Sequence, residues 1–181
     1  MEANEAQELQ EHAEHGSHDS GLRPVALTMT VLAVLVALTT VMGHRTHTEA
    51  VLNQAKASDT WNEYQSKKIR AYNTELETNL LNVVAVADSD GAKKLAKGYA
   101  GHQEKWAEEL KELTAQAQEL EAEVSLAEHK AKFFDLGEAL LEIGLVITSV
   151  TLLTRRRAYW FAGMASSVGG IASVLYALLL K

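Results

Sequence analysis

The segment from Asp135 to Arg157 (DLGEALLEIGLVITSVTLLTRRR) constrains the fold more than any other part of the sequence. Its uncharged part, Ile143 to Thr154, would span only about 18 Å as a helix, which is too short to cross a bilayer. A crossing helix must therefore begin near Asp135 and carry Glu138 and Glu142 below the membrane surface. Ionisable residues at such a depth are costly and usually functional.

Two further runs, Pro24 to Gly43 and Ala158 to Leu180, are uncharged and long enough to span a bilayer. A signal peptide is the alternative interpretation of the first run. It is disfavoured because the run is long and the residues before it are acidic rather than basic. We therefore predict an all-α membrane protein with transmembrane helices at residues 24–43, 135–154 and 158–180.

The basic loop Arg155 to Arg157 predicts the orientation, because short basic loops stay in the cytoplasm. The helix over 135–154 then runs inward and the helix over 158–180 runs outward. Residues 1–23 are expected in the cytoplasm. The stretch 44–134 and the C-terminus are expected on the other side.

Composition favours helix and narrows the function. The chain has one proline, Pro24, and no cysteine, so disulfides, thiolate metal sites and cysteine nucleophiles are excluded. A net charge of −7 argues against nucleic acid as a partner. We find no glycine-rich phosphate loop after a strand, no nucleophile elbow and no HExxH motif. The sequence therefore predicts a protein that is not an enzyme and holds no cofactor.

The stretch 44–134 is predicted to be a helical hairpin with its turn at 88–91 (DSDG). Continuous helices over 25–87 and 92–154 would be equal, at about 63 residues or ~95 Å each. In this antiparallel hairpin, residue i faces roughly residue 179 − i. That pairing puts Tyr72 beside Trp106, and Thr30 level with Ser149.

The second arm has a heptad seam of the coiled-coil type, which extends into the membrane segment. Its members are Trp106, Leu110, Leu113, Ala117, Leu120, Val124, Ala127, Ala131, Phe134, Glu138 and Leu141. The first arm has a poorer seam (Ile69, Tyr72, Leu76, Val83) with charges nearby. Because the first arm has a weak seam, we expect a homo-oligomer in which another hairpin covers that arm.

The third membrane helix carries Gly163, Ser167 and Gly170 on one face. Small residues at spacings of four and three permit close helix packing. The pattern leaves open whether the partner helix belongs to the same chain or to another copy.

The candidate site consists of Asp135, Glu138 and Glu142, which lie within about 60° on one helix face. One hypothesis is a ring that binds a cation or proton when several copies turn this face inward. The alternative is that Glu138 pairs with Arg45 or His44, while Glu142 reaches water through a polar crevice.

Histidines suggest two weaker metal sites. Residues 1–23 read as a disordered acidic tail in which His12, His15 and His18 recur every third residue. They are candidate ligands for Zn²⁺, Ni²⁺ or Cu²⁺, against the alternative of a solvated tail. His44 and His47 share a face and are candidates to join Asp135, against the alternative of hydrogen-bonded interface residues.

Several motifs together carry a resemblance: EHAEHGSH before the first membrane run, then GHRTH, WNEYQSKKIR, FFDLGEALLEIGL and LLTRRR. In combination the chain resembles a bacterial domain-of-unknown-function family of small three-helix membrane proteins. The resemblance implies a multi-pass protein of the bacterial inner membrane. It implies no activity and lends no catalytic residues.

The first functional hypothesis is an oligomeric membrane scaffold whose extracytoplasmic hairpin binds a protein partner. The alternative is a small oligomeric ion or proton channel that uses the intramembrane carboxylates. The expected partners are the lipid bilayer, further copies of the chain and a protein bound by the hairpin.

Overall fold

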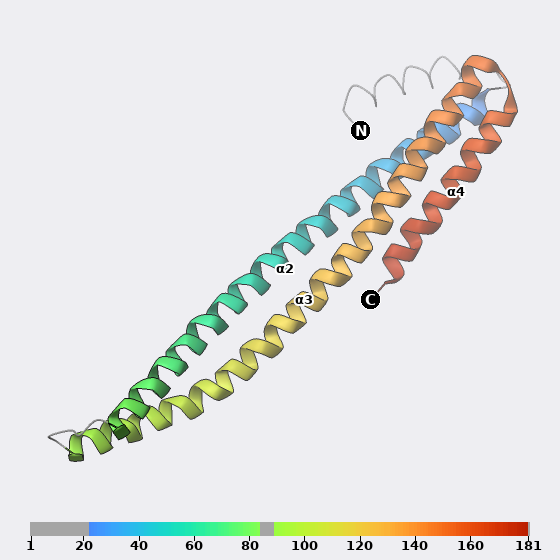
Figure 1. Ribbon diagram of the computed structural model, residues 1–181. Coiled ribbons are helices and arrows are strands. Elements are labelled where there is room, and N and C mark those ends of the chain that lie inside the picture. The colour runs from blue at the N-terminus through green and yellow to red at the C-terminus, as the bar shows by residue number, and fades with distance from the viewer. Residues whose placement is uncertain (1–21, 84–88, 181) are drawn as a thin grey trace. The chain divides into compact units, whose positions relative to one another are not determined.

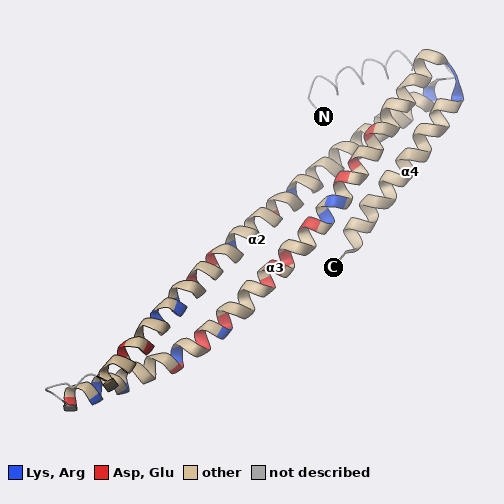
Figure 2. Cartoon of the chain, in the orientation of Figure 1, with Lys and Arg blue, Asp and Glu red and all other residues tan. Residues whose placement is uncertain are grey.

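The computed structural model of the chain describes residues 22–83 and 89–180. These residues form three helices and no strand: α2 (Arg23–Val83), α3 (Ser89–Thr154) and α4 (Arg157–Leu179) (Figure 1). The predicted all-α class with three helices is confirmed. By length and composition, each helix contains a stretch able to cross a membrane. Figure 2 shows that α4 carries no acidic or basic residue beyond Arg157.

The described chain divides into two compact units. The first unit contains the residues up to Ala50 and from Ser125 onward, and therefore part of α2, part of α3 and all of α4. The second unit is Val51–Val124, which contains the remaining parts of α2 and α3.

In the first unit, α2 and α3 enclose an apolar core. Met29, Leu32 and Val36 of α2 pack with Leu141 and Leu145 of α3, and all five side chains are buried. Removal of apolar surface from a polar medium is the main driving force for such packing in water. In a bilayer, van der Waals contact between the same side chains replaces it.

Helix α4 packs against α3 through small residues, and the two backbones come close together. A Cβ added at Gly163 would lie 2.6 Å from the carbonyl oxygen of Gly144. A Cβ added at Gly170 would lie 2.8 Å from the carbonyl oxygen of Gly137. The small-residue face of α4 therefore contacts α3 of its own chain.

Two serines of α4 hold the same interface by hydrogen bonds to α3. Ser166 donates to the carbonyl oxygen of Leu140 at 2.8 Å, and Ser173 donates to that of Phe133 at 2.7 Å. The rings of Phe133 and Tyr176 meet edge to face, with centroids 4.6 Å apart. Hydrogen bonds between helices are useful in lipid, where water does not compete.

In the second unit, polar contacts join α2 to α3. Asn53 donates to Glu123 at 3.1 Å, and Trp61 donates through Nε1 to Glu121 at 2.8 Å. The Lys67 ammonium lies 2.9 Å from Glu109. Residue numbers rise along α2 while their partners' numbers fall along α3, so the helices are antiparallel here.

The seam predicted on the second arm faces inward along its whole length. Its members are buried (Leu113, Ala117, Val124, Ala127, Ala131, Phe134, Leu141) or half-buried (Trp106, Leu110, Leu120, Glu138). Leucine, alanine and valine at heptad spacing were sufficient to identify this face.

The seam predicted on the first arm is wrong. Ile69, Tyr72 and Leu76 are each 59% exposed, and Val83 is 84% exposed. The inward face of α2 is a different set at spacings of three and four: Asn53, Ala57, Thr60, Tyr64, Lys67, Ala71, Thr74, Thr78 and Leu81. This seam is built from small and polar residues, so an apolar pattern does not reveal it.

The connections between helices differ in detail from the predicted ranges. Helix α3 begins at Ser89, so Asp90 and Gly91 of the predicted turn lie in its first turn, whereas Asp88 is outside the described residues. Helices α3 and α4 are joined through Arg155 and Arg156. Arg155 has a left-handed backbone, with φ of 54°, which ends α3 sharply.

The hydroxyl groups of Thr30 and Ser149, which the predicted register puts level with each other, bond within their own helices. Thr30 donates to the carbonyl oxygen of Ala26, and Ser149 to that of Val146. Such local bonds to a carbonyl three or four residues back are always within reach in a helix.

Candidate functional site

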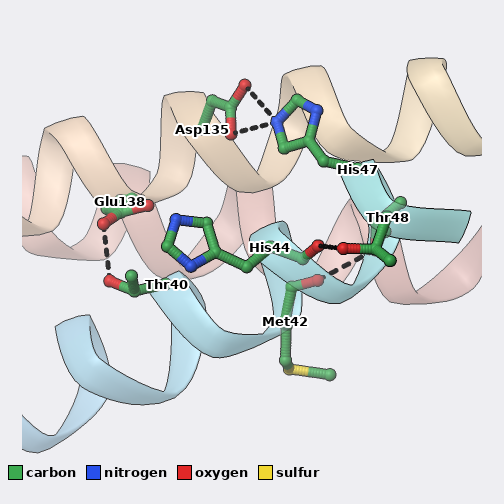
Figure 3. Close-up of polar contacts among 8 residues, drawn as sticks. Thr40, Met42, His44, His47, Thr48, Asp135 and Glu138 are labelled. Atoms are coloured by element: carbon green, nitrogen blue, oxygen red, sulfur yellow. Dashed lines mark hydrogen bonds and ion pairs between the residues drawn. The ribbon is translucent and has the colours of Figure 1, made fainter. Parts of the chain in front are cut away.

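The candidate acids lie on α3 in the first unit. Figure 3 shows Asp135 and Glu138 on the part of α3 beside α2. Asp135 and Glu138 each contact a side chain of α2, whereas Glu142 does not. The two contacts come from Thr40 and His47, which lie seven residues apart and therefore on nearly the same face of α2.

The Glu138 carboxyl oxygen lies 2.5 Å from the hydroxyl oxygen of Thr40. The same hydroxyl also lies 3.0 Å from the carbonyl oxygen of Val36. A threonine has one hydroxyl proton, so it donates to only one of these oxygens at a time. Val36 and Glu138 therefore share one hydroxyl donor.

Asp135 accepts from His47, whose Nε2 lies 3.1 Å from each carboxylate oxygen. The two side chains are 53% and 52% exposed, so solvent reaches both. A protonated imidazole makes this contact an ion pair, and a neutral imidazole with its proton on Nε2 makes it a hydrogen bond.

The expected ion-pair partners of these acids take no part in the described contacts. Thr40 occupies the position beside Glu138, and His47 occupies the position beside Asp135. Arg45 and His44 are exposed. Figure 3 shows the His44 side chain on the same stretch of α2 as Thr40 and His47. We predicted Arg45 as a partner of Glu138 because of its charge. In the structure, the neutral side chain of Thr40 lies beside Glu138 instead.

Glu142 is half-buried, one turn beyond Glu138 on the same side of α3. Within residues 22–83 and 89–180, no hydrogen bond or ion pair joins its carboxylate. The neighbouring residues Leu141 and Leu145 are buried in the α2–α3 core. Glu142 is thus the acid whose position the fold of one chain explains least.

No group of three or more His, Cys, Asp or Glu side chains suited to a metal occurs in the described part of the chain. The pairing of His47 with Asp135 therefore gains no third ligand from His44. His12, His15 and His18 lie outside the described residues, so the proposed tail site is not tested.

Charged side chains of the second unit form a separate cluster on the inward face. Hydrogen bonds from Lys67 to Glu109 and Glu63 raise the pKa of Lys67. The same lysine holds the pKa of Glu109 below its usual value. Lys67 therefore sits in the seam as a paired charge.

An aromatic cluster lies beside it. The Lys68 ammonium lies 5.4 Å from the ring centre of Tyr64 and 5.8 Å from that of Tyr72, within cation–π range. Contact with the hydroxyl of Tyr64 raises the pKa of Lys68.

Comparison with protein families matches residues 21–180 to a family described as a domain of unknown function, DUF4337. The chain belongs to this family. The resemblance noted from the sequence motifs is thereby confirmed at the level of an uncharacterised domain family. Comparison with curated proteins and with solved structures gave no significant match.

Membership of DUF4337 assigns no chemistry to the acids of α3. What the site can do chemically follows from its geometry. It offers one carboxyl in contact with a hydroxyl (Glu138), one in contact with an imidazole (Asp135) and one without a described partner (Glu142).

Proposed function

We propose that this DUF4337 protein is a non-enzymatic scaffold of the bacterial inner membrane. Its apolar segments anchor it in the bilayer. The parts of α2 and α3 in the second unit form an extracytoplasmic antiparallel hairpin that binds other protein chains. The protein acts as an oligomer.

The observation that supports this proposal is the shared register of the α2–α3 contacts in both units. In the first unit, the numbers of Thr40 and Glu138 total 178. In the second unit, those of Asn53 and Glu123 total 176, and those of Trp61 and Glu121 total 182. All lie close to the predicted total of 179. Within each unit, α2 and α3 therefore run antiparallel in the register that a helical hairpin requires.

The composition of the second unit supports exposure to water. Its charged residues include the Lys67–Glu109 pair, whose members would be expensive to place in hydrocarbon. The basic connection at Arg155 and Arg156 favours a cytoplasmic location for the α3–α4 loop. On the support of these features, we propose that the hairpin lies outside the cytoplasm.

Cysteine labelling tests the proposed orientation, because the native chain has no cysteine. We expect Glu108→Cys, on an exposed position of α3, to react with a membrane-impermeant maleimide in spheroplasts. Arg156→Cys is the matched control and should react only after the membrane is opened. Labelling of Arg156→Cys but not Glu108→Cys in closed cells would overturn the orientation.

A second candidate function is conduction of protons or cations through an assembly of several copies. It is favoured by the contact between Glu138 and the Thr40 hydroxyl on facing helices, and by Glu142, which has no partner in the described chain. The test is proton and cation flux into liposomes that contain the purified protein. Conduction predicts flux that Glu142→Gln abolishes, whereas the scaffold predicts no flux and unchanged assembly.

A further inference from the structure

Helix α2 carries an apolar stripe on its outer side in the second unit. We define this outer stripe as Ile69, Tyr72, Leu76, Leu80 and Val83. All five side chains are more than half exposed in the whole chain. Spacings of three and four residues are those of a coiled-coil seam. A cluster of apolar side chains at this spacing is typical of an interaction surface.

The outer stripe cannot be reached by α3 of the same chain. At 100° per residue, its members lie within an arc of about 80° on α2. The α3-facing residues, such as Ala71 and Thr74, lie on the opposite side of the helix. Thr74 is only 8% exposed, which marks the covered side. Helix α2 therefore has two seams, and the hairpin buries the more polar one.

We propose that a second copy of this chain docks on the outer stripe through its own α2, parallel and in register. This inference rests on the proposed function, because copies anchored in one membrane have α2 helices that run in the same direction. Ile69 then meets Ile69 of the second copy, and Leu76 meets its counterpart. The interface is a two-stranded coil between hairpins.

The choice of occupant follows from which surfaces of the chain match. An occupant must present apolar residues at the same spacings over about two heptads. In the second unit, the outward side of α3 offers one large exposed apolar residue, Leu95, among charged ones. The matching surface within this unit is the outer stripe itself, so the contact is between identical surfaces.

Charges beside the outer stripe are compatible with this parallel arrangement. In a parallel coil, the residue before each a position, here Ile69 or Leu76, faces the residue five positions further along in the partner. Lys68 then faces Asn73 of the second copy, and Glu75 faces Leu80. No like charges meet across the interface, so the register carries no electrostatic penalty.

A second copy would stabilise the hairpin, because the contact between α2 and α3 of one chain is weak on the α2 side. The residues on the inward face of α2 are mostly small or polar, and include Ala57, Ala71 and Thr74. Burial of Ile69 and Leu76 between copies supplies the apolar packing that the single hairpin lacks.

Single cysteines in the full chain, reconstituted in nanodiscs and in native membranes, test the proposal under mild oxidation. We expect Ile69→Cys, Leu76→Cys and Val83→Cys each to form a disulfide-linked dimer. Glu108→Cys, exposed on α3, is the control for random collision and should remain monomeric. Dimers at Leu76→Cys alone would indicate an antiparallel contact and overturn the parallel register. Equal cross-linking of Glu108→Cys, or none at the outer stripe, would overturn the interface.

A second measurement separates loss of docking from loss of folding. Leu76→Glu should weaken dimerisation at least about tenfold, because a carboxylate would have to be buried without a partner. Leu95→Glu is the matched control, because Leu95 is an exposed leucine of the same unit that lies on α3, off the stripe. Helix content by circular dichroism should be unchanged in both. An unchanged dimer in Leu76→Glu would overturn the proposal.

Failure of the inference and failure of the proposed function can be told apart. Glu108→Cys, which lies off the outer stripe, reports orientation through the impermeant maleimide, independently of cross-linking. If Leu76→Cys is labelled but remains monomeric, the extracytoplasmic hairpin is still supported, whereas docking of a second copy on the outer stripe is contradicted. Unlabelled Glu108→Cys in closed cells would contradict the proposed function itself.

Discussion

Gly144 of α3 and Gly163 of α4 lie with their backbones in contact, so neither position has room for a side chain. A Cβ on Gly163 would lie 2.6 Å from the Gly144 carbonyl oxygen, and one on Gly144 would lie 2.8 Å from the Gly163 carbonyl oxygen. Both distances are shorter than real Cβ atoms show, and the obstacle is backbone that cannot rotate away. The close packing of α3 against α4 therefore depends on the absence of a side chain at these two residues.

Gly163→Ala should separate α3 from α4 and destabilise the protein by about 1–3 kcal/mol, the usual cost of overpacking. The measurement is unfolding in mixed micelles with increasing sodium dodecyl sulfate. Gly169→Ala is the matched control on the same helix, because its added Cβ would meet only Leu140 at an ordinary 3.6 Å. Equal stability of the two variants would contradict the close backbone contact.

Thr40 and Glu138 should show energetic coupling of about 1 kcal/mol, the scale of hydrogen bonds between helices in membranes. The coupling is measured by a double-mutant cycle with Thr40→Val and Glu138→Gln in the same unfolding assay. Thr40→Ser retains the hydroxyl and should behave like the native protein. Thr30→Val is the control, because the Thr30 hydroxyl bonds only within α2 among the described contacts. Additive effects of the two substitutions would show that the 2.5 Å contact contributes nothing.

The sequence was enough to predict the hairpin register but not the rotation of α2 about its axis. Two arms of equal length around one turn signal define which residues are level with each other. Thr40 was therefore already within one position of the level of Glu138. Rotation depends on which side of α2 faces α3, and we assigned it from Ile69 and Leu76 because apolar residues usually face the partner. In the structure, Lys67 occupies the inner side because Glu63 and Glu109 satisfy its charge.

The small residues of α4 show a different limit of prediction from the sequence. Gly163 and Gly170 predicted close packing correctly, since small residues have few other uses on a membrane helix. They could not predict the partner, because a small-residue face fits any helix that also has one. The matching residues Gly137 and Gly144 on α3 lie seven positions apart, as Gly163 and Gly170 do. This shared spacing was the feature of the sequence that could have identified α3 as the partner of α4.

The corrected rotation of α2 predicts a different cross-link from the one the apolar pattern suggests. Cysteines at Ala71 and Trp106 should form a disulfide within one chain, because both positions are half-buried on facing seams. Cysteines at Tyr72 and Trp106 should not, since Tyr72 is 59% exposed on the outer side. Gel mobility of the monomer under oxidising and reducing conditions distinguishes the two pairs. Efficient closure of the Tyr72 pair within one chain would restore the original rotation.

The Lys67–Glu109 pair should make the second unit sensitive to acid. Lys67 holds the folded-state pKa of Glu109 below its ordinary value of 4.5, mainly through a hydrogen bond. A depressed carboxyl pKa gives a stabilisation that is present above the unfolded-state pKa and lost as the pH falls through the folded-state pKa. Lys67 has a raised pKa, so its contribution is present below 10.5 and lost in more alkaline solution. The pair therefore stabilises the hairpin between these limits.

Glu109→Gln should consequently lower the melting temperature at about pH 7 and have a smaller effect at a second, acidic pH below the lowered folded-state pKa of the native carboxyl. Thermal melts by circular dichroism at the two pH values measure this. Glu108→Gln is the control, because Glu108 is the exposed neighbour and forms no ion pair with the described residues. Lys105 approaches the same carboxylate at 3.7 Å and retains a weaker contact, so Lys67→Met should lower the melting temperature more than Lys105→Met. A melting difference for Glu109→Gln that is equally large at both pH values would show that shape, rather than charge, determines the role of Glu109.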